Sequence, residues 1–239
     1  MGLKEFFRRK SPLEKAGKDL MEPYAQSDVR RAAISTLFSL GTPESYTEVL
    51  KRFNYSSNGS IADEAEKLDL VDYCVDAGEP MIGPLKTHIQ NEKALAFPIR
   101  ALSQLVDRDD LLATINNSLQ AKAPLDHRTS DAKRALVIAV GDYGNESQAE
   151  FLFPYLEDHS DDVQMQTIEA LERLGAENSS QALSEVCCRD THAARIQHRA
   201  ARARIVLEVS VKKFYERFMP EVKSEFILGK KGVLVQRSR

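Results

Sequence analysis

The sequence predicts an all-α protein in which helix pairs stack one after another into an α-solenoid. Internal repetition is the main observation. Residues 28–41, DVRRAAISTLFSLG, have a copy at residues 162–175, DVQMQTIEALERLG, in which Val, Ile, two Leu and the final Gly recur at one offset of 134. Weaker copies end near residues 78, 109, 144 and 208, so successive ends lie 31 to 37 residues apart. A period of this length is typical of helical repeat proteins.

Composition is the second observation. The chain has 239 residues, of which 42% are hydrophobic and 29% charged, as in ordinary globular proteins. No apolar run approaches the roughly 18 residues that a membrane-spanning helix needs. The first residues lack the apolar core of a secretory signal, and the three cysteines lack metal-ligand spacing, so we expect a cytoplasmic protein with reduced thiols.

The repeated stretch has the pattern of an amphipathic helix. Its apolar residues fall on one helical face: Val29, Ala33, Leu37 and Leu40. Asp28 is expected to accept hydrogen bonds from the first N–H groups, and Gly41 to take the left-handed conformation that ends a helix. Both ends of the helix are therefore marked in the sequence.

The same apolar spacing and helix-end signals predict an outer and an inner helix in each repeat, about six pairs in all. Outer helices are expected at residues 11–26, 42–53, 80–90, 109–121, 147–157 and 179–189. Inner helices are expected at residues 28–40, 62–77, 97–106, 131–143, 162–174 and 194–209. Ser11-Pro12 and Thr42-Pro43 combine a capping hydroxyl with a proline in the first turn. Residues 54–60 and 122–130 are predicted loops.

The two ends differ from the repeats. Residues 1–10, MGLKEFFRRK, form a basic amphipathic segment that either caps the first repeat, which we favour, or touches an anionic membrane. Residues 11–210 form the array. Residues 211–239 are expected to contain a capping helix at 211–219, stopped by Pro220, and a basic tail with a possible small hairpin.

These residues resemble HEAT-like repeats, particularly the short bacterial form named after the phycobilisome lyases. The inner-helix motif of that family is supplied here by Asp28, Val29, Arg30, Ala33, Leu37, Leu40 and Gly41. The resemblance covers about residues 11–210 and implies the fold. It also implies that Asp28, Arg30, Asp131 and Lys133 cap helices and bridge neighbouring repeats, and it makes a lyase-type enzyme or enzyme accessory one alternative function.

No catalytic or metal-binding motif stands out, so no catalytic residue, metal or cofactor is predicted. The five histidines show no spacing typical of a metal site, and no Gly-x-Ser-x-Gly nucleophile motif occurs. Catalysis by Ser/His/Asp or Cys/His groups that are far apart in the sequence is not excluded at this point. We expect a protein that is not an enzyme.

Asp69, Asp72 and Asp76 align on one face of a predicted inner helix, at positions i, i+3 and i+7. One interpretation is an acidic ledge that receives a basic peptide or a polyamine. The other is a solvated charged face, which is the usual role of such residues.

Arg195, Arg199 and Arg202 share one face of the last inner helix. From Arg189 onward the chain carries 13 basic and 5 acidic residues. This region is therefore a candidate contact for phosphates or an acidic partner. Nucleic acid is not favoured, because the middle of the chain is acidic.

Three functional hypotheses follow. The first is a non-enzymatic scaffold that binds a protein partner on the concave face of the repeat array. The second is the lyase-type alternative, and the third is nucleic-acid binding through the basic C-terminal region. The sequence does not identify the partner, the pathway or the oligomeric state.

Overall fold

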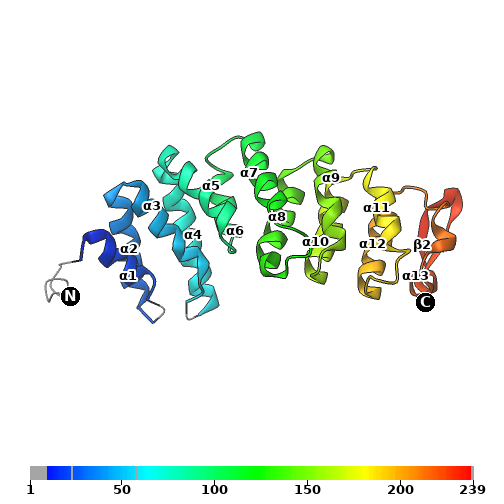
Figure 1. The fold of residues 1–239 in the computed structure, drawn as a ribbon, viewed down its shortest axis with the longest axis horizontal. Coiled ribbons are helices and arrows are strands. Elements are labelled where there is room, and N and C mark those ends of the chain that lie inside the picture. The colour runs from blue at the N-terminus through cyan, green and yellow to red at the C-terminus, as the bar shows by residue number, and fades with distance from the viewer. Residues whose placement is uncertain (1–9, 23, 58, 238–239) are drawn as a thin grey trace, which may run out of the picture. The chain divides into compact units, whose positions relative to one another are not determined.

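The computed structural model describes residues 10–22, 24–57 and 59–237 (Figure 1). The chain divides into two compact units, Met1–Thr114 and Ile115–Arg239. The boundary falls inside helix α7, Arg108–Gln120. The predicted basic amphipathic segment at residues 1–10 lies outside the described residues, apart from Lys10.

The first unit consists of two layers of helices. The outer layer contains α1, α3 and α5, spanning Pro12–Leu20, Pro43–Leu50 and Ile82–Asn91. The inner layer contains α2, α4 and α6, spanning Ser27–Leu40, Ser60–Ala77 and Ala96–Leu102. Each outer helix packs against the inner helix next to it, and α2 contacts α4 as α4 contacts α6.

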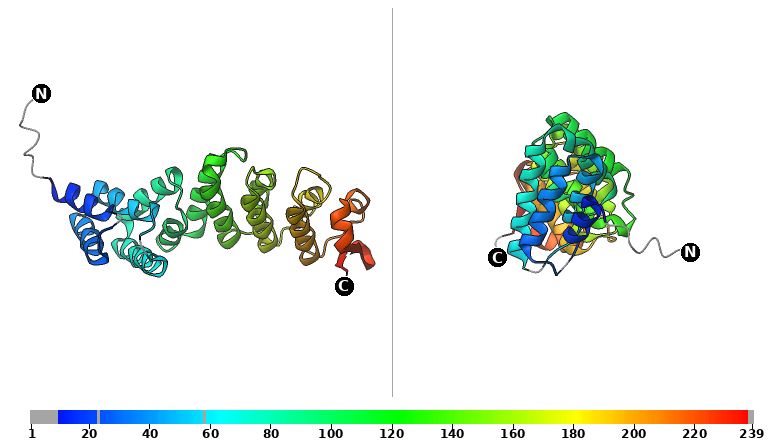
Figure 2. Two further views of the ribbon diagram at one scale, coloured as in Figure 1. Left: turned by 90° about the horizontal axis from the view of Figure 1, so that it is seen from below. Right: turned by 90° about the vertical axis from the view of Figure 1, so that its left-hand side faces the viewer.

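The second unit repeats this arrangement (Figure 2). Its inner helices are α8, α10 and α12, spanning Ser130–Tyr143, Asp161–Leu174 and Ala194–Val206. Its outer elements are α9, Ala149–Leu152, with the 3-10 turn Phe153–Glu157, and α11, Ser179–Val186. The unit ends with α13, Pro220–Glu225, and an antiparallel hairpin of β1, Phe226–Leu228, and β2, Leu234–Gln236. The predicted hairpin is thus present.

The repeated stretch forms the expected helix, although its buried face differs from the prediction. Gly41 and Gly175 end α2 and α10 in the left-handed conformation, with φ of 62° and 66°. The buried residues of α2 are Arg30, Ala33, Ile34 and Leu37, whereas Val29 and Leu40 are 41% and 37% exposed. Arg30 is buried because it pairs with a carboxylate of the next inner helix.

Asp28 is not the N-cap residue that the sequence predicts, although its side chain does accept from an N–H of the first turn. The helix already begins at Ser27, and Asp28 lies in its first turn, where Oδ1 accepts from the N–H of Val29 at 2.9 Å. A carboxylate in the first turn still interacts favourably with the positive end of the helix dipole.

Prolines explain the main differences in helix length. The outer helix predicted at residues 147–157 is an α-helix only over Ala149–Leu152, because Pro154 lacks the N–H that would continue it. The capping helix predicted at 211–219 is absent; the segment contains only the 3-10 turn Tyr215–Arg217. Pro220 begins α13 instead of ending a helix, since proline fits the first helical position.

The core runs between the layers. Ile168 and Leu171 of α10 are fully buried. The helices α8 and α10 approach closely at Gly141, where an added Cβ would lie 2.9 Å from Cβ of Ala170. Small residues at this crossing allow the two inner helices to pack in register. The predicted all-α class is confirmed.

Candidate partner-binding groove

A groove of about 470 Å³ lies between the inner helices α2 and α4 of the first unit. It is lined by Arg31, Ile34, Glu66, Asp69, Asp72, Tyr73 and Asp76. The three aspartates predicted as an acidic ledge therefore lie together along one wall. Ile34 and Glu66 form the buried floor.

A buried cluster of charges supports this floor. Glu66 Oε1 accepts from Nε of Arg30 at 2.9 Å and from Nε of Arg52 at 2.5 Å. Asp63 Oδ1 accepts from Arg52 NH2 at 2.6 Å, and Asp63 Oδ2 lies 2.8 Å from Nζ of Lys67. We call these five residues the buried ion cluster.

The ion cluster keeps both carboxylates charged. Burial raises the pKa of Glu66, but hydrogen bonds from Arg30 and Arg52 outweigh it, so the pKa is lowered overall. Burial acts in the same way on Asp63, and hydrogen bonds from Lys67, Ser57 and Arg52 again lower the pKa overall. Removing one partner would leave an uncompensated buried charge, which is costly. The cluster therefore fixes the geometry beneath the groove.

The three aspartates differ in what they contact. Asp69 Oδ2 lies 3.3 Å from NH2 of Arg31, and both side chains are more than half exposed. This bridge links α2 to α4. Asp72 and Asp76 are exposed and form no ion pair within 4.0 Å in the described part of the chain. Two carboxylates at one end of the groove are thus left to solvent.

An exposed aromatic ring stands beside these carboxylates. Tyr73 is 44% exposed and stacks on Phe38 of α2, with ring centroids 5.4 Å apart and an interplanar angle of 23°. Phe38 in turn packs against Tyr46 at 5.9 Å. The Tyr73 ring is therefore held in place while part of its surface faces solvent.

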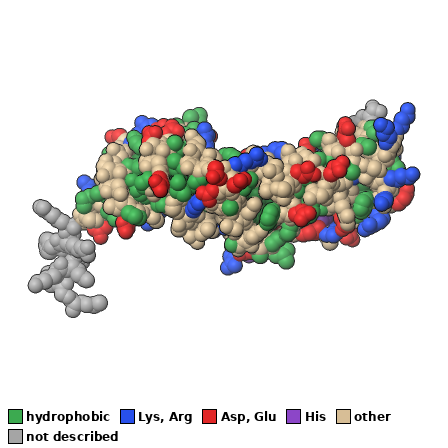
Figure 3. Space-filling model, turned by 90° about the horizontal axis from the view of Figure 1, so that it is seen from above, with side chains coloured by type: hydrophobic (Ala, Val, Ile, Leu, Met, Phe, Trp, Pro, Cys, Tyr) green, Lys and Arg blue, Asp and Glu red, His purple; other side chains and the backbone are tan. Residues whose placement is uncertain are grey.

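The basic face predicted on α12 is largely engaged within its own unit. Arg195 NH2 lies 2.8 Å from Asp161 Oδ2, and Arg199 NH1 lies 2.6 Å from Glu172 Oε2. Both carboxylates belong to α10, so these arginines bridge adjacent inner helices. Arg202 is exposed and has no ion pair among the residues described. In Figure 3, basic side chains gather over the C-terminal end of the chain.

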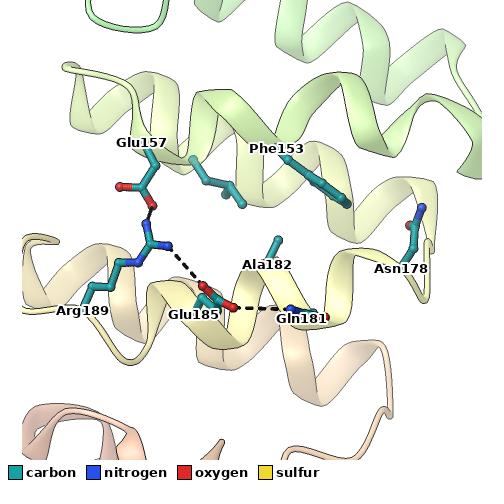
Figure 4. Close-up of a pocket in the computed structure, with 8 residues that line it drawn as sticks. Phe153, Glu157, Asn178, Gln181, Ala182, Glu185 and Arg189 are labelled. Carbon is teal, nitrogen blue, oxygen red and sulfur yellow. Dashed lines mark hydrogen bonds and ion pairs between the residues drawn. The ribbon is translucent and has the colours of Figure 1, made fainter.

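A second groove, of about 360 Å³, lies in the second unit between the turn Phe153–Glu157 and α11 (Figure 4). Phe153 and Ala182 point into it, and Arg189 bridges Glu157 and Glu185 at one end. The anionic groups here are already paired. The sequence did not predict this groove. It forms where two outer elements pack against each other, and no local sequence pattern marks it.

No cysteine is prepared for nucleophilic chemistry. Burial raises the pKa of Cys74 to about 12, and burial likewise raises the pKa of Cys187. Burial also raises the pKa of Cys188. A nucleophilic cysteine needs the opposite shift.

Neither a metal site nor a membrane-spanning helix is found among the residues that the structure describes. No three His, Cys, Asp or Glu side chains converge there in a way that could hold a metal ion. Among the same residues, no helix combines the length and the apolar character needed to cross a bilayer.

Sequence analysis identified the aspartates of the groove but missed Arg31, Tyr73 and the ion cluster. Arg52 and Glu66 lie 14 residues apart and meet only when the helices pack. The one available signal was Arg30, a charged residue at a fixed place in the repeat motif.

The stacked helix pairs and the groove between inner helices define an α-helical repeat protein of the solenoid class. Residues 121–203 match a family model described as HEAT repeats. This match, together with the helical repeats of the structure, supports the HEAT-like repeat protein that the sequence indicated. HEAT repeats generally mediate interactions between proteins. No curated protein matches the chain significantly.

Proposed function

We propose that this protein is a non-enzymatic scaffold that binds a basic segment of another protein in the groove between α2 and α4. The observation that carries this proposal is the pair of exposed carboxylates, Asp72 and Asp76, which form no ion pair with any described residue and lie beside the exposed ring of Tyr73. Carboxylates attract Lys and Arg, and an aromatic face adds a cation–π contact.

The groove is also suited to recognition because its floor is rigid. The buried ion cluster holds Glu66 from both sides, and stacking on Phe38 fixes Tyr73. A fixed site loses little conformational entropy on binding, which favours affinity. Aromatic side chains at such positions often contribute most of the binding energy of an interface.

The two alternatives have less support. A lyase-type enzyme needs convergent reactive groups, whereas the cysteines have raised pKa values and the second groove contains paired charges. Nucleic-acid binding through α12 needs free cations, whereas Arg195 and Arg199 already contact carboxylates of α10.

The test is a binding measurement with synthetic peptides of matched length, one rich in lysine and arginine and one in which these residues are glutamate. Fluorescence anisotropy is recorded for the wild type and for Asp72→Asn combined with Asp76→Asn. Glu44→Gln combined with Glu79→Gln is the control, because it removes the same charge from exposed positions of the same unit outside the groove.

We expect the basic peptide to bind the wild type and the control equally well, with affinity that falls as salt rises. The aspartate variant should bind it about tenfold more weakly, as expected when interface charges are lost. Equal losses in the variant and the control would show a non-specific charge effect and contradict the proposal.

A further inference from the structure

A third groove, of about 490 Å³, lies between α1 and α2 in the first unit. Most of its lining is apolar or small and includes Pro12, Ala16, Val29, Ala32, Ala33 and Thr36. Ala16 and Ala33 form the buried floor, whereas Val29 is 41% exposed. The groove shares no lining residue with the groove between α2 and α4. We call it the end groove.

The end groove corresponds to a surface that is covered in a later repeat. At the repeat offset of 134, Val29 and Thr36 of α2 correspond to Val163 and Ala170 of α10. Both residues of α10 are fully buried, and Ala170 lies against Gly141 of the preceding inner helix, α8. On α2 the same two positions are exposed, and the structure describes no helix before α1. The end groove is therefore the place that a preceding repeat would fill.

At its other end, the chain covers the last inner helix with a segment that is not a repeat. The helix α12 contacts α13 and β2. Val222 of α13, Phe226 of β1 and Leu234 of β2 are buried. Repeat arrays need such terminal elements, because the apolar face of the last repeat would otherwise stay in water. The same physical requirement applies to α2.

The chain itself supplies nine residues that lead directly to the end groove. Residues 1–9, MGLKEFFRR, precede Lys10, which lines the groove. They contain three large apolar side chains, Leu3, Phe6 and Phe7. Phe6 and Phe7 lie four and three residues before Lys10, a reach of about 10–14 Å, which is enough to span the roughly 8–10 Å between two packed helices.

Shape and charge favour this segment as the occupant. The alanines of the floor leave room for an aromatic ring, and each phenylalanine that is buried removes about 150–250 Å² from water. Lys15 and Asp19 also line the groove, and neither forms an ion pair with any described residue. Residues 1–9 carry charges of both signs, Glu5 for Lys15 and Arg8 and Arg9 for Asp19.

We infer that residues 1–9 dock in the end groove of their own chain, with the rings of Phe6 and Phe7 against Ala16, Val29 and Ala33. The segment thereby caps the first helix pair, as α13 and the hairpin cap the last. This inference does not depend on the proposed function, because the two grooves have different lining residues.

The experiment measures how fast a maleimide labels a cysteine placed in the end groove of the full chain. Thr36→Cys reports on the groove, and Thr47→Cys on α3 is the matched control outside it. Both threonines are exposed, and each donates from Oγ1 to the carbonyl four residues earlier, that of Ala32 or Pro43. Peptide mass spectrometry separates these sites from the native cysteines.

The label should react about tenfold more slowly at position 36 than at position 47, because the docked segment must open before the reagent can enter. Each cysteine variant is then combined with Phe6→Ser and Phe7→Ser. These substitutions should raise the rate at position 36 to that at position 47. An unchanged rate at position 47 shows that the first unit remains folded.

Equal rates at the two positions of the otherwise unchanged chain would overturn the inference, and so would protection that survives Phe6→Ser with Phe7→Ser. Protection that weakens on dilution, with a dimer in analytical ultracentrifugation, would assign the end groove to a second copy and also overturn the inference. Equal rates together with binding to phosphatidylserine vesicles that is lost in the Phe6/Phe7 variant would assign residues 1–9 to a membrane instead.

Discussion

Lys133 and Asp158 form an ion pair in which both side chains are fully buried, with Nζ 2.6 Å from Oδ2. Nζ of Lys133 also donates to the carbonyls of Ala123 and Pro124 at 3.2 and 2.7 Å. Lys133 thereby ties the loop before α8 to the turn before α10. Three other inner helices have a long polar side chain at the corresponding position that is anchored in a similar way: Arg30, Gln164 and Gln197 donate to the carbonyls of Ala25, Asp158 and Arg189.

Lys133→Met should destabilise the protein by about 3–5 kcal/mol, because it leaves the carboxylate of Asp158 buried without its partner. Urea denaturation measures this loss. Lys86→Met is the matched control, since Lys86 pairs with Asp110 at a partly exposed site and should cost no more than about 1 kcal/mol. Equal effects of the two substitutions would contradict the idea that burial makes the loss of this ion pair more costly.

Acid should weaken the first unit through Glu66. Its folded pKa is lowered, so its ionised form stabilises the protein above its unfolded pKa of about 4.3, and this stability is lost as the pH falls further. Glu66→Gln should lower the melting temperature at pH 7 and flatten its dependence on pH below about 4.3. Melting curves at several pH values, with Glu44→Gln as the exposed control, test this. An unchanged acid dependence would contradict it.

Leu171→Ala should cost about 2–5 kcal/mol, since it leaves a cavity in the fully buried seam between inner helices. Val206→Ala provides the contrast: Val206 is 61% exposed, and its loss should change stability by less than about 0.5 kcal/mol. Chemical denaturation midpoints distinguish the two. A negligible effect at Leu171 would mean that the core relaxes around the missing side chain.

Arg204 replaces the leucine of the repeat motif, and its role is visible only in the fold. It is fully buried, burial lowers its pKa to about 10, and NH2 donates to the carbonyls of Val209 and Ser210 at 3.1 Å. Arg204→Met should destabilise the protein by about 1–3 kcal/mol, because two part-buried carbonyls lose the guanidinium donor. Arg202→Met, at an exposed position, is the control in thermal melting. A gain in stability would mean that desolvation of the guanidinium costs more than its hydrogen bonds return.

Several local features were predictable from the sequence because their physical cause is local. The glycines at 41 and 175 end helices as expected, because only a residue without Cβ adopts positive φ there at no cost. The bridging role expected of Arg30 and Lys133 is confirmed by their contacts with Glu66 and Asp158. The role of Pro220 was predicted wrongly. A proline can follow the end of one helix or occupy the first position of the next, and the flanking sequence did not decide between these two roles.

The sequence by itself determined the helical repeat, its period and the alignment of three aspartates on one helix, because these depend on residues within a few turns of each other. Tertiary structure decided which charges are buried and which are free. Arg195 and Arg199 became bridges to α10, Arg31 engaged Asp69, and Asp72 and Asp76 kept no partner in the described part of the chain. The physical reason is that the energy of a charge depends on its distance to other charges and to water, and packing between helices sets both.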